Sequence, residues 1–106
     1  MVTKRQIDGL TRRIVRHFQP LRIVLFGSYA YGMPKEHSDV DLLVVLPSVE
    51  SRLRKAVEIR NVVHGGFPFD LIVHSRQSLQ ERLQKEDFFL MEVVQKGKTL
   101  YEAPDA

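Results

Sequence analysis

Residues 21–46 read LRIVLFGSYAYGMPKEHSDVDLLVVL and contain two apolar runs joined by a polar connector. The first run, Leu21 to Phe26, is short and rich in β-branched residues, so it predicts a strand that ends at Gly27–Ser28. The second run, Asp39 to Leu46, is apolar without alternation, which is typical of a strand buried on both faces. Residues 29–38 between the two strands are expected to form a polar connector that contains Gly32 and Pro34.

Helices are predicted on both sides of this stretch. Thr3 and Gln6 form a capping box that opens a first helix, which is expected to end near Phe18. A second helix is expected over residues 47–63, after the second strand. Its inner side is expected to carry four apolar residues: Val49, Leu53, Ala56 and Val57.

The remaining sequence predicts a third strand, more helix and an edge strand. Phe67 to His74 read as the third strand. Ser78 and Glu81 form another capping box, which opens a helical region with a break near Asp87. Lys98 to Glu102 are expected to add a short strand at an edge of the sheet.

The order α-β-β-α-β-α predicts an α/β (α+β) fold with a small mixed sheet and helices packed on it. The strand–helix–strand unit over residues 39–74 should be a right-handed parallel crossover. The sequence has 106 residues, so we expect a single domain over residues 1–106.

Composition excludes several classes of protein. With 43% apolar residues and no cysteine, the chain is neither disordered nor a disulfide scaffold, and it has no thiol nucleophile or thiolate metal site. The longest apolar run, Leu42 to Leu46, is too short to cross a bilayer, and residues 1–13 lack the apolar stretch of a signal peptide. A cytoplasmic location is therefore expected.

The formal net charge of +3 suits an anionic ligand such as a nucleotide, but it falls short of a nucleic-acid footprint. Three arginines of the first helix, Arg5, Arg12 and Arg16, fall opposite its apolar stripe. We interpret them as a solvated helix face in preference to a binding patch.

Three aspartates stand at the starts of two apolar strands. Asp39 and Asp41 are two residues apart, so on a strand their side chains would point to one face. Asp70 lies inside the third strand between apolar residues. Because a half-buried carboxylate cluster repels itself unless a cation offsets it, this pattern indicates a divalent-metal site in preference to ordinary strand-end solvation.

The expected topology brings these groups to one edge of the sheet. If the first two strands are antiparallel, the end at Gly27–Ser28 lies beside the start that carries Asp39 and Asp41. The parallel crossover then returns Asp70 to the same edge. Gly27 would let backbone amides approach a phosphate closely, and Ser28 would supply a hydroxyl at the start of a helical turn.

Residues 27–45, GSYAYGMPKEHSDVDLLVV, carry a resemblance to a known family. A Gly-Ser pair followed ten residues later by Asp39-Val40-Asp41 resembles the signature of the DNA polymerase β-like nucleotidyltransferase superfamily. The short chain is similar to its minimal nucleotidyltransferase (MNT) branch, and Asp70 matches the position of the family's third carboxylate. The resemblance covers about residues 7–94.

This resemblance implies a transfer of a nucleoside monophosphate, with AMP from ATP as the expected case, to an acceptor hydroxyl. Asp39 and Asp41 would hold two magnesium ions, and Asp70 would complete the second metal site and lower the pKa of the acceptor hydroxyl. Gly27 and Ser28 would hold the β and γ phosphates of the nucleoside triphosphate.

The resemblance also implies a partner. Larger members of the superfamily add a domain that binds the acceptor, so for this chain a partner protein is expected to supply that surface or to be the acceptor. In the family, such chains are commonly paired with a HEPN-domain protein as antitoxin and toxin, and some inactivate the toxin by transferring AMP to a tyrosine. An antitoxin that acts as an adenylyltransferase is thus implied.

Some residues depart from the family pattern or leave alternatives open. Tyr29 follows the Gly-Ser pair where many relatives have arginine, and Tyr31 comes two residues later. Either Lys35 or another cation meets the triphosphate, or the two tyrosines simply pack under the loop. Arg60 either extends into solvent, which we favour, or pairs with an aspartate or phosphate. His74 shares a strand face with Asp70, but we do not expect it in the site. Residues 88–94 are apolar on more than one side and suit an interface.

Two rival functions remain open from the sequence. The first is a degenerate, non-catalytic module that neutralises a partner by covering it, against which the three intact aspartates argue. The second is a nucleic-acid-binding enzyme that uses the basic first helix, for which binding should weaken steeply with salt.

Overall fold

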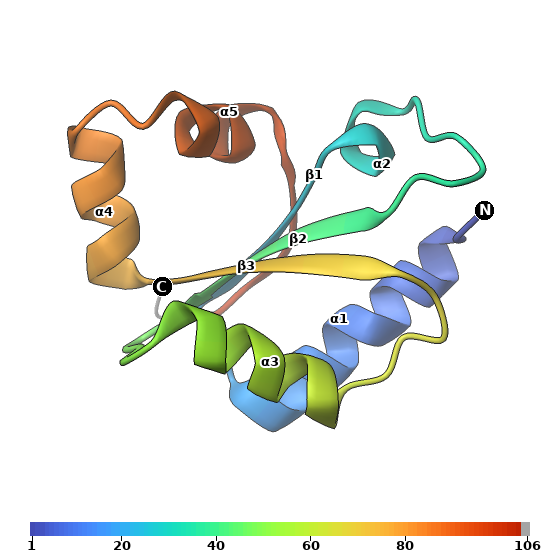
Figure 1. The fold of residues 1–106 in the computed structure, drawn as a ribbon, viewed down its shortest axis with the longest axis horizontal. Helices are drawn as coiled ribbons and strands as arrows, with labels where there is room; N and C mark the ends of the chain where they lie inside the picture. Colours follow the sequence, from blue (N-terminus) through green and yellow to red (C-terminus); the bar gives the residue numbers. More distant parts are fainter. Residues whose placement is uncertain (105–106) are drawn as a thin grey trace.

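A computed structural model gives the structure of this protein, and residues 1–104 are described below. Within them, five helices and four strands follow one another along the chain (Figure 1). Their bounds are α1 (Lys4–Phe18), β1 (Arg22–Phe26), α2 (Ser28–Tyr31), β2 (Val40–Leu46), α3 (Arg52–Val62), β3 (Phe69–Ser75), α4 (Arg76–Gln84), α5 (Phe88–Lys96) and β4 (Lys98–Glu102).

The four strands form one mixed sheet in the order β3-β2-β1-β4. β1 is antiparallel to both of its neighbours, whereas β2 and β3 are parallel and are joined through α3. The mixed sheet, the antiparallel first pair and the parallel crossover are therefore confirmed, as is the edge strand over residues 98–102.

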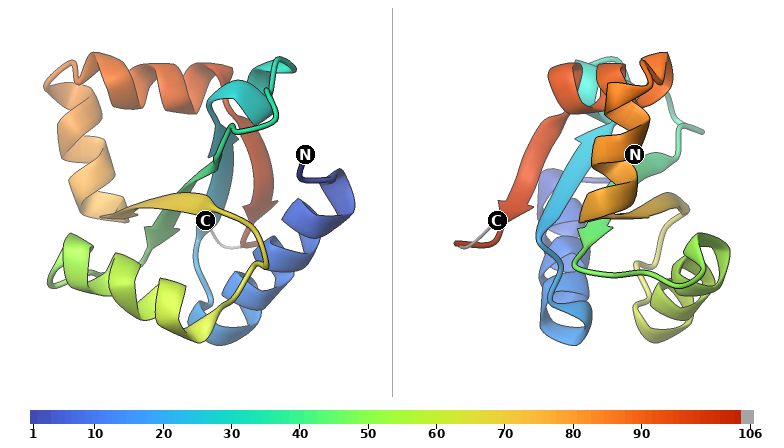
Figure 2. Two further views of the ribbon diagram at one scale, coloured as in Figure 1. Left: turned by 45° about the vertical axis from the view of Figure 1, so that its right-hand side comes forward. Right: turned by 90° about the vertical axis from the view of Figure 1, so that its left-hand side faces the viewer.

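Helices cover both faces of the sheet (Figure 2). α1 and α3 bury one core cluster against alternate residues of the strands, such as Ile23 and Leu42. α4 and α5 bury a second cluster against the intervening residues, such as Val24 and Leu43. β1 and β2 thus contribute side chains to both clusters, which explains why their sequences are apolar without alternation.

The predicted first helix is confirmed from its cap to its end. The Thr3 hydroxyl accepts a hydrogen bond from the Gln6 amide at 3.1 Å, and the Gln6 side chain accepts one from the Thr3 amide at 2.8 Å. This capping box satisfies two amides that the helix itself cannot satisfy. Arg5, Arg12 and Arg16 lie exposed on the outer face, as expected.

The connector between the first two strands begins with a helical turn, as expected at Ser28. α2 makes a single turn that begins directly after Gly27 and ends at Gly32, whose φ of 80° is readily adopted only by glycine. The turn is too short to leave an apolar periodicity in the sequence. β2 also begins at Val40, so Asp39 precedes the strand.

The expected inner side of the second long helix was wrong. α3 begins at Arg52, because Ser51 caps it by accepting from the Arg54 amide, and residues 47–51 form a loop. Leu53 and Val57 are 83% and 56% exposed, while Ile59 is fully buried in the core together with Val63, the residue just after the helix. Apolar residues occur all around this helix, so its pattern does not fix which face turns inward. Val49 and Ala56 pack partly against the core, as expected.

The last helical region also begins elsewhere than predicted. Ser75 caps α4 by accepting from the Ser78 amide at 3.0 Å, so Ser78 is not the cap and lies within the helix. The break near Asp87 is confirmed, because the Asp87 side chain caps α5 by accepting from the Leu90 amide at 3.1 Å. Within residues 1–104 no helix is both long and apolar enough to cross a bilayer.

Candidate active site at the aspartate edge of the sheet

The sheet register brings the predicted site residues to one edge. Phe26, the last residue of β1, pairs with Asp41, and Asp41 pairs in turn with Asp70 on the parallel strand β3. Gly27 and Ser28 follow Phe26 directly. The end of β1 and the starts of β2 and β3 therefore meet where the sequence places its glycine turn and its carboxylates.

Asp41 and Asp70 belong to the face that α4 and α5 cover. Side chains alternate along a strand, and Leu43 and Ile72, two residues further on, pack in the cluster on that face. α4 and α5 leave this end of the strands partly uncovered, so Asp41 is only half-buried and Asp70 is exposed. Asp39 is also exposed, in the loop before β2.

The three carboxylates interact electrostatically. Partial burial raises the pKa of Asp41 above its usual value, and the nearby charges of Asp70 and Asp39 raise that pKa further. Each cause disfavours the ionised form of Asp41. A cation bound at this position would lower the free energy of the ionised cluster.

The donors at this edge fit a hard divalent cation, because carboxylate oxygens are the ligands that Mg²⁺ prefers. Their spacing is wider than that of an assembled site. Within residues 1–104 no group of three or more His, Asp or Glu side chains lies close enough together to hold a metal ion. Asp39 lies outside β2, so the strand alternation does not fix its side chain beside that of Asp41.

Gly27 is positioned against Asp41. Its φ of 76° and ψ of −160° lie in a region that only glycine populates readily, and a Cβ at residue 27 would collide with Oδ2 of Asp41. The Gly27 carbonyl accepts hydrogen bonds from the amides of Ala30 and Tyr31, which closes the turn of α2. The amides of Ser28 and Tyr29 begin this turn and therefore have no acceptor inside it.

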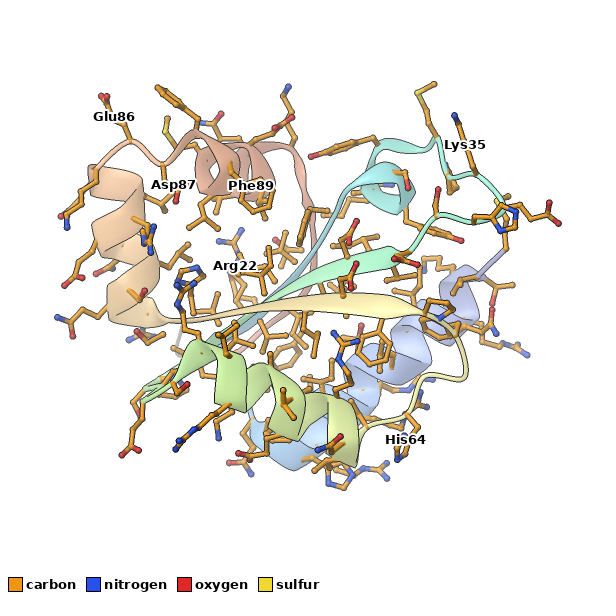
Figure 3. The ribbon with its side chains drawn as sticks, viewed as in Figure 1. Arg22, Lys35, His64, Glu86, Asp87 and Phe89 are labelled. Carbon is orange, nitrogen blue, oxygen red and sulfur yellow. The ribbon has the colours of Figure 1, made fainter. Side chains whose placement is uncertain are left out.

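Tyr29 packs under the loop, which is one of the two alternatives that the sequence left open, whereas Tyr31 is 44% exposed and does not. The Tyr29 hydroxyl accepts a hydrogen bond from the Val2 amide at 3.1 Å, and its ring packs against the core beside α1. Lys35 is exposed on the connector after α2 (Figure 3).

Two residues that the sequence raised as possible additions lie elsewhere. His74 is buried at the other end of β3, where its ring contacts Arg52 and Ser78. Arg60 is exposed, and its guanidinium lies over the ring of Phe69, 5.4 Å from the centroid. Neither hydrogen-bonds an aspartate of the cluster among the contacts of residues 1–104.

A hollow beside Asp39 had no signal in the sequence. It has a volume of about 360 Å³ and lies between the start of α1, the connector before β2 and the loop before β3. Its walls include Tyr29, Ser38, Asp39 and Phe67. These residues come from segments far apart in the chain, so spacing alone could not have grouped them.

Comparison with known proteins identifies the family. Residues 7–100 match the model of the nucleotidyltransferase domain (NTP_transf_2). The chain belongs to the nucleotidyltransferase domain family. The match spans the glycine turn and all three aspartates, and no curated protein sequence gives a significant match.

Solved structures share the nucleotidyltransferase fold. A nucleotidyltransferase from Sulfolobus solfataricus, described as putative, superposes with a TM-score of 0.63 at 17% identity, over 92% of this chain and 78% of that one. A toxin–antitoxin with AMP-PNP gives a TM-score of 0.59 at 22% identity, over 92% and 75% of the two chains. A mutant of the toxin–antitoxin MntA-HpeT gives 0.58 at 20% identity, with the same coverage. At these identities the similarity establishes the fold.

Proposed function

We propose that this nucleotidyltransferase transfers AMP from ATP to a hydroxyl on a partner protein, in a reaction that requires Mg²⁺. The observation that carries the proposal is the contact of Gly27 with Asp41, with Asp70 next to Asp41 in register. One edge of the sheet thus carries two features: a glycine turn that a phosphate can approach, and two neighbouring carboxylates. Structural stability alone gives no reason to keep two repelling aspartates side by side.

Gly27 and Ser28 would bind the triphosphate. Without a Cβ at residue 27, phosphate oxygens can approach the backbone beside Asp41. The Ser28 hydroxyl stands at the start of α2, next to amides that have no acceptor within the turn. These groups would hold the β and γ phosphates and so orient the α phosphate toward the aspartates.

Asp39, Asp41 and Asp70 would hold the metal. Bound there, Mg²⁺ supplies neutralisation of the triphosphate charge and a lower pKa for the acceptor hydroxyl. The raised pKa of Asp41 supports this assignment, since a carboxylate destabilised by its neighbours gains most from a cation. The three side chains would close in from the wider spacing that the structure has.

Asp70 would also receive the acceptor's proton. It is exposed, so a hydroxyl group can reach its carboxylate from solvent. As the acceptor oxygen bonds to the α phosphorus, the bond from that phosphorus to the β-phosphate oxygen breaks. Pyrophosphate leaves, and the hydroxyl proton passes to a carboxylate oxygen of Asp70.

The acceptor is proposed to be a HEPN-type toxin, which this chain would neutralise as its antitoxin. Two structures with the same fold are toxin–antitoxin complexes, one of them with AMP-PNP, and they support this assignment. A surface suitable for docking lies near the site. On α5, Phe88 is 77% exposed and Phe89, labelled in Figure 3, is 49% exposed. The Phe89 ring contacts that of Phe26 at the end of β1.

The test measures the mass of the partner after incubation. Wild type with ATP and Mg²⁺ should add discrete AMP increments to its cognate partner. Asp70→Asn should still bind that partner, because docking and chemistry use different surfaces, but should leave its mass unchanged. If wild type suppresses the partner's activity without changing its mass, the protein is a covering module and the proposed transfer is wrong.

A further inference from the structure

Residues of α1 and of the edge strand β4 line a groove. It has a volume of about 450 Å³. It is lined by residues of α1 and β4: Asp8, Thr11, Arg12, Val15, Arg16, Leu100 and Tyr101. We call it the α1–β4 groove.

A bulge in β4 makes the floor of this groove apolar. Ile23 pairs with Tyr101 but Val24 pairs with Thr99, so Leu100 is an extra residue in the edge strand. Because of the bulge, Leu100 and Tyr101 both pack against the cluster on the α1 side, although they are consecutive. Val15 of α1 packs against the same cluster from the other wall.

The wall formed by α1 carries an excess of positive charge, with Arg12 and Arg16 against the single carboxylate of Asp8. Arg12 and Arg16 are one helical turn apart and exposed, and like charges at this spacing destabilise a helix. No carboxylate of residues 1–104 forms an ion pair with either guanidinium. Asp8, the acidic residue of this region, lies 3.5 Å from the Lys4 ammonium.

We propose that the α1–β4 groove binds an acidic amphipathic segment of a partner protein. Apolar side chains of that segment would cover Leu100 and Tyr101, while its carboxylates would pair with Arg12 and Arg16. Charge complementarity selects this occupant. Addition of a strand to the edge of β4 fits less well, because the bulge and Lys98 both oppose pairing at that edge.

A nucleic acid fits the groove less well than a protein segment. Of the apolar side chains in the groove only Tyr101 is aromatic, whereas single strands bind to several successive stacking platforms. The net charge of +3 is also small for a nucleic-acid-binding domain.

The groove lies on the face of the sheet opposite to the aspartates. Leu100 and Tyr101 pack with the cluster under α1 and α3, while Asp41 and Asp70 belong to the face under α4 and α5. A segment bound in the groove therefore leaves the nucleotide site free. The proposal does not depend on the proposed transfer, and the two can be tested separately.

The test titrates the isotope-labelled protein with three probes and follows the backbone amide signals by NMR. The first probe is a synthetic peptide with leucines on one helical face and glutamates on the other. The second has lysine in place of every glutamate, and the third is a single-stranded oligoadenylate RNA. The acidic peptide should shift the signals of Thr11, Val15, Leu100 and Tyr101, and the two other probes should not.

Charge reversals provide the matched comparison. Arg12→Glu with Arg16→Glu should weaken binding of the acidic peptide at least about tenfold, because two charge-assisted contacts are lost. Lys4→Glu with Arg5→Glu changes the net charge equally on the same helix and should cost much less. Arg12→Gln with Arg16→Gln, which disturbs the helix least, should give a smaller loss in the same direction as the reversal.

Several results would overturn the proposal. If both charge-reversal pairs weakened binding of the acidic peptide equally, the peptide would be attracted to the basic helix in general and not to the groove. Equal shifts with the lysine peptide would remove the role of charge, and preferential binding of the RNA in the groove would assign it to nucleic acid. Binding of the acidic peptide without shifts at Leu100 and Tyr101 would place it elsewhere.

Discussion

Gly27 lies so close to the carboxylate of Asp41 that a side chain at residue 27 would overlap Oδ2 of the aspartate. The two residues come from neighbouring antiparallel strands, since Phe26 pairs with Asp41 and Gly27 follows Phe26. The positive φ of Gly27 turns the backbone into α2 at this point. The position that requires glycine, residue 27, therefore lies beside Asp41, the half-buried aspartate of the three.

Replacement of Gly27 by alanine should disrupt this arrangement. The conformation costs a residue with a Cβ roughly 1–3 kcal/mol, and the methyl group would also displace the Asp41 carboxylate. We expect a lower melting temperature and a loss of Mg²⁺-dependent triphosphate binding, measured by calorimetry. Gly32→Ala, also at positive φ but with open space around it, should lower stability without a comparable loss of binding.

Ser28→Ala tests the proposed phosphate contact separately from the backbone. Removal of one hydroxyl should weaken triphosphate binding by roughly 1 kcal/mol, the scale of one hydrogen bond, with little change in melting temperature. The opposite pattern, normal binding with a clear loss of stability, would make Ser28 a structural residue.

Asp41→Asn should separate stability from function. The pKa of Asp41 is raised in the folded protein, so its ionised form opposes folding at neutral pH. The stability linked to this group is complete below its unfolded pKa and is lost as the pH rises through the folded pKa. The variant should therefore melt above wild type near neutral pH, and this advantage should shrink as the pH falls toward the unfolded value.

Substitution of Asp39 together with Asp41 should remove the metal response. Mg²⁺ with a triphosphate should raise the melting temperature of wild type but not that of Asp39→Asn with Asp41→Asn. Undiminished Mg²⁺-dependent binding by that folded double variant would sink the proposed metal site.

The sequence predicts the edge of the sheet better than it predicts the helices around it. The runs before Gly27 and after Asp39 have one interpretation each, because both are β-branched, apolar and bounded by breakers. Their antiparallel pairing then follows from the short connector, and Asp70 follows from the parallel crossover.

Helix faces and starts depended on information that is not local. α3 carries apolar residues on several sides, and packing against the sheet selects Ile59 over Leu53. At α4 the sequence pattern predicts Ser78 as the cap, whereas Ser75 caps the helix in the structure. The length of β3 decides between them, since the strand extends to Ser75 itself. The separation of the Asp39 side chain from that of Asp41 likewise depends on where β2 begins, one residue after Asp39.

His74 should make stability depend on pH. Arg52 Nη1 lies 3.2 Å from His74 Nε2, and a guanidinium can only donate, so Nε2 accepts and the neutral ring carries its proton on Nδ1. That proton is donated to Ser78 Oγ, 2.9 Å away. Burial lowers the pKa of His74, the charges of Arg52 and Arg82 lower it further, and Asp87 opposes them.

The sign of the effect follows from linkage. The folded pKa of His74 lies below the unfolded value of 6.5, so the unfolded chain binds more protons between the two values. The stabilisation is complete above 6.5 and is lost as the pH falls through the folded pKa. The free energy of unfolding, measured with urea at several pH values across this range, should change less steeply with pH for His74→Asn than for wild type. His37→Asn, at an exposed position, should leave the slope unchanged.

Phe88 tests the docking surface beside the site. The side chain is 77% exposed on α5, so Phe88→Asp should leave the melting temperature nearly unchanged. If the partner docks there, burial of a charge in place of an aromatic ring should weaken the complex at least about tenfold, measured by calorimetry. Leu53→Asp is the matched control, because Leu53 is 83% exposed on α3, on the other face of the sheet. Equal effects of the two substitutions would remove α5 from the interface. A selective effect of Phe88→Asp on binding, with triphosphate affinity retained, would place α5 in the interface with the partner.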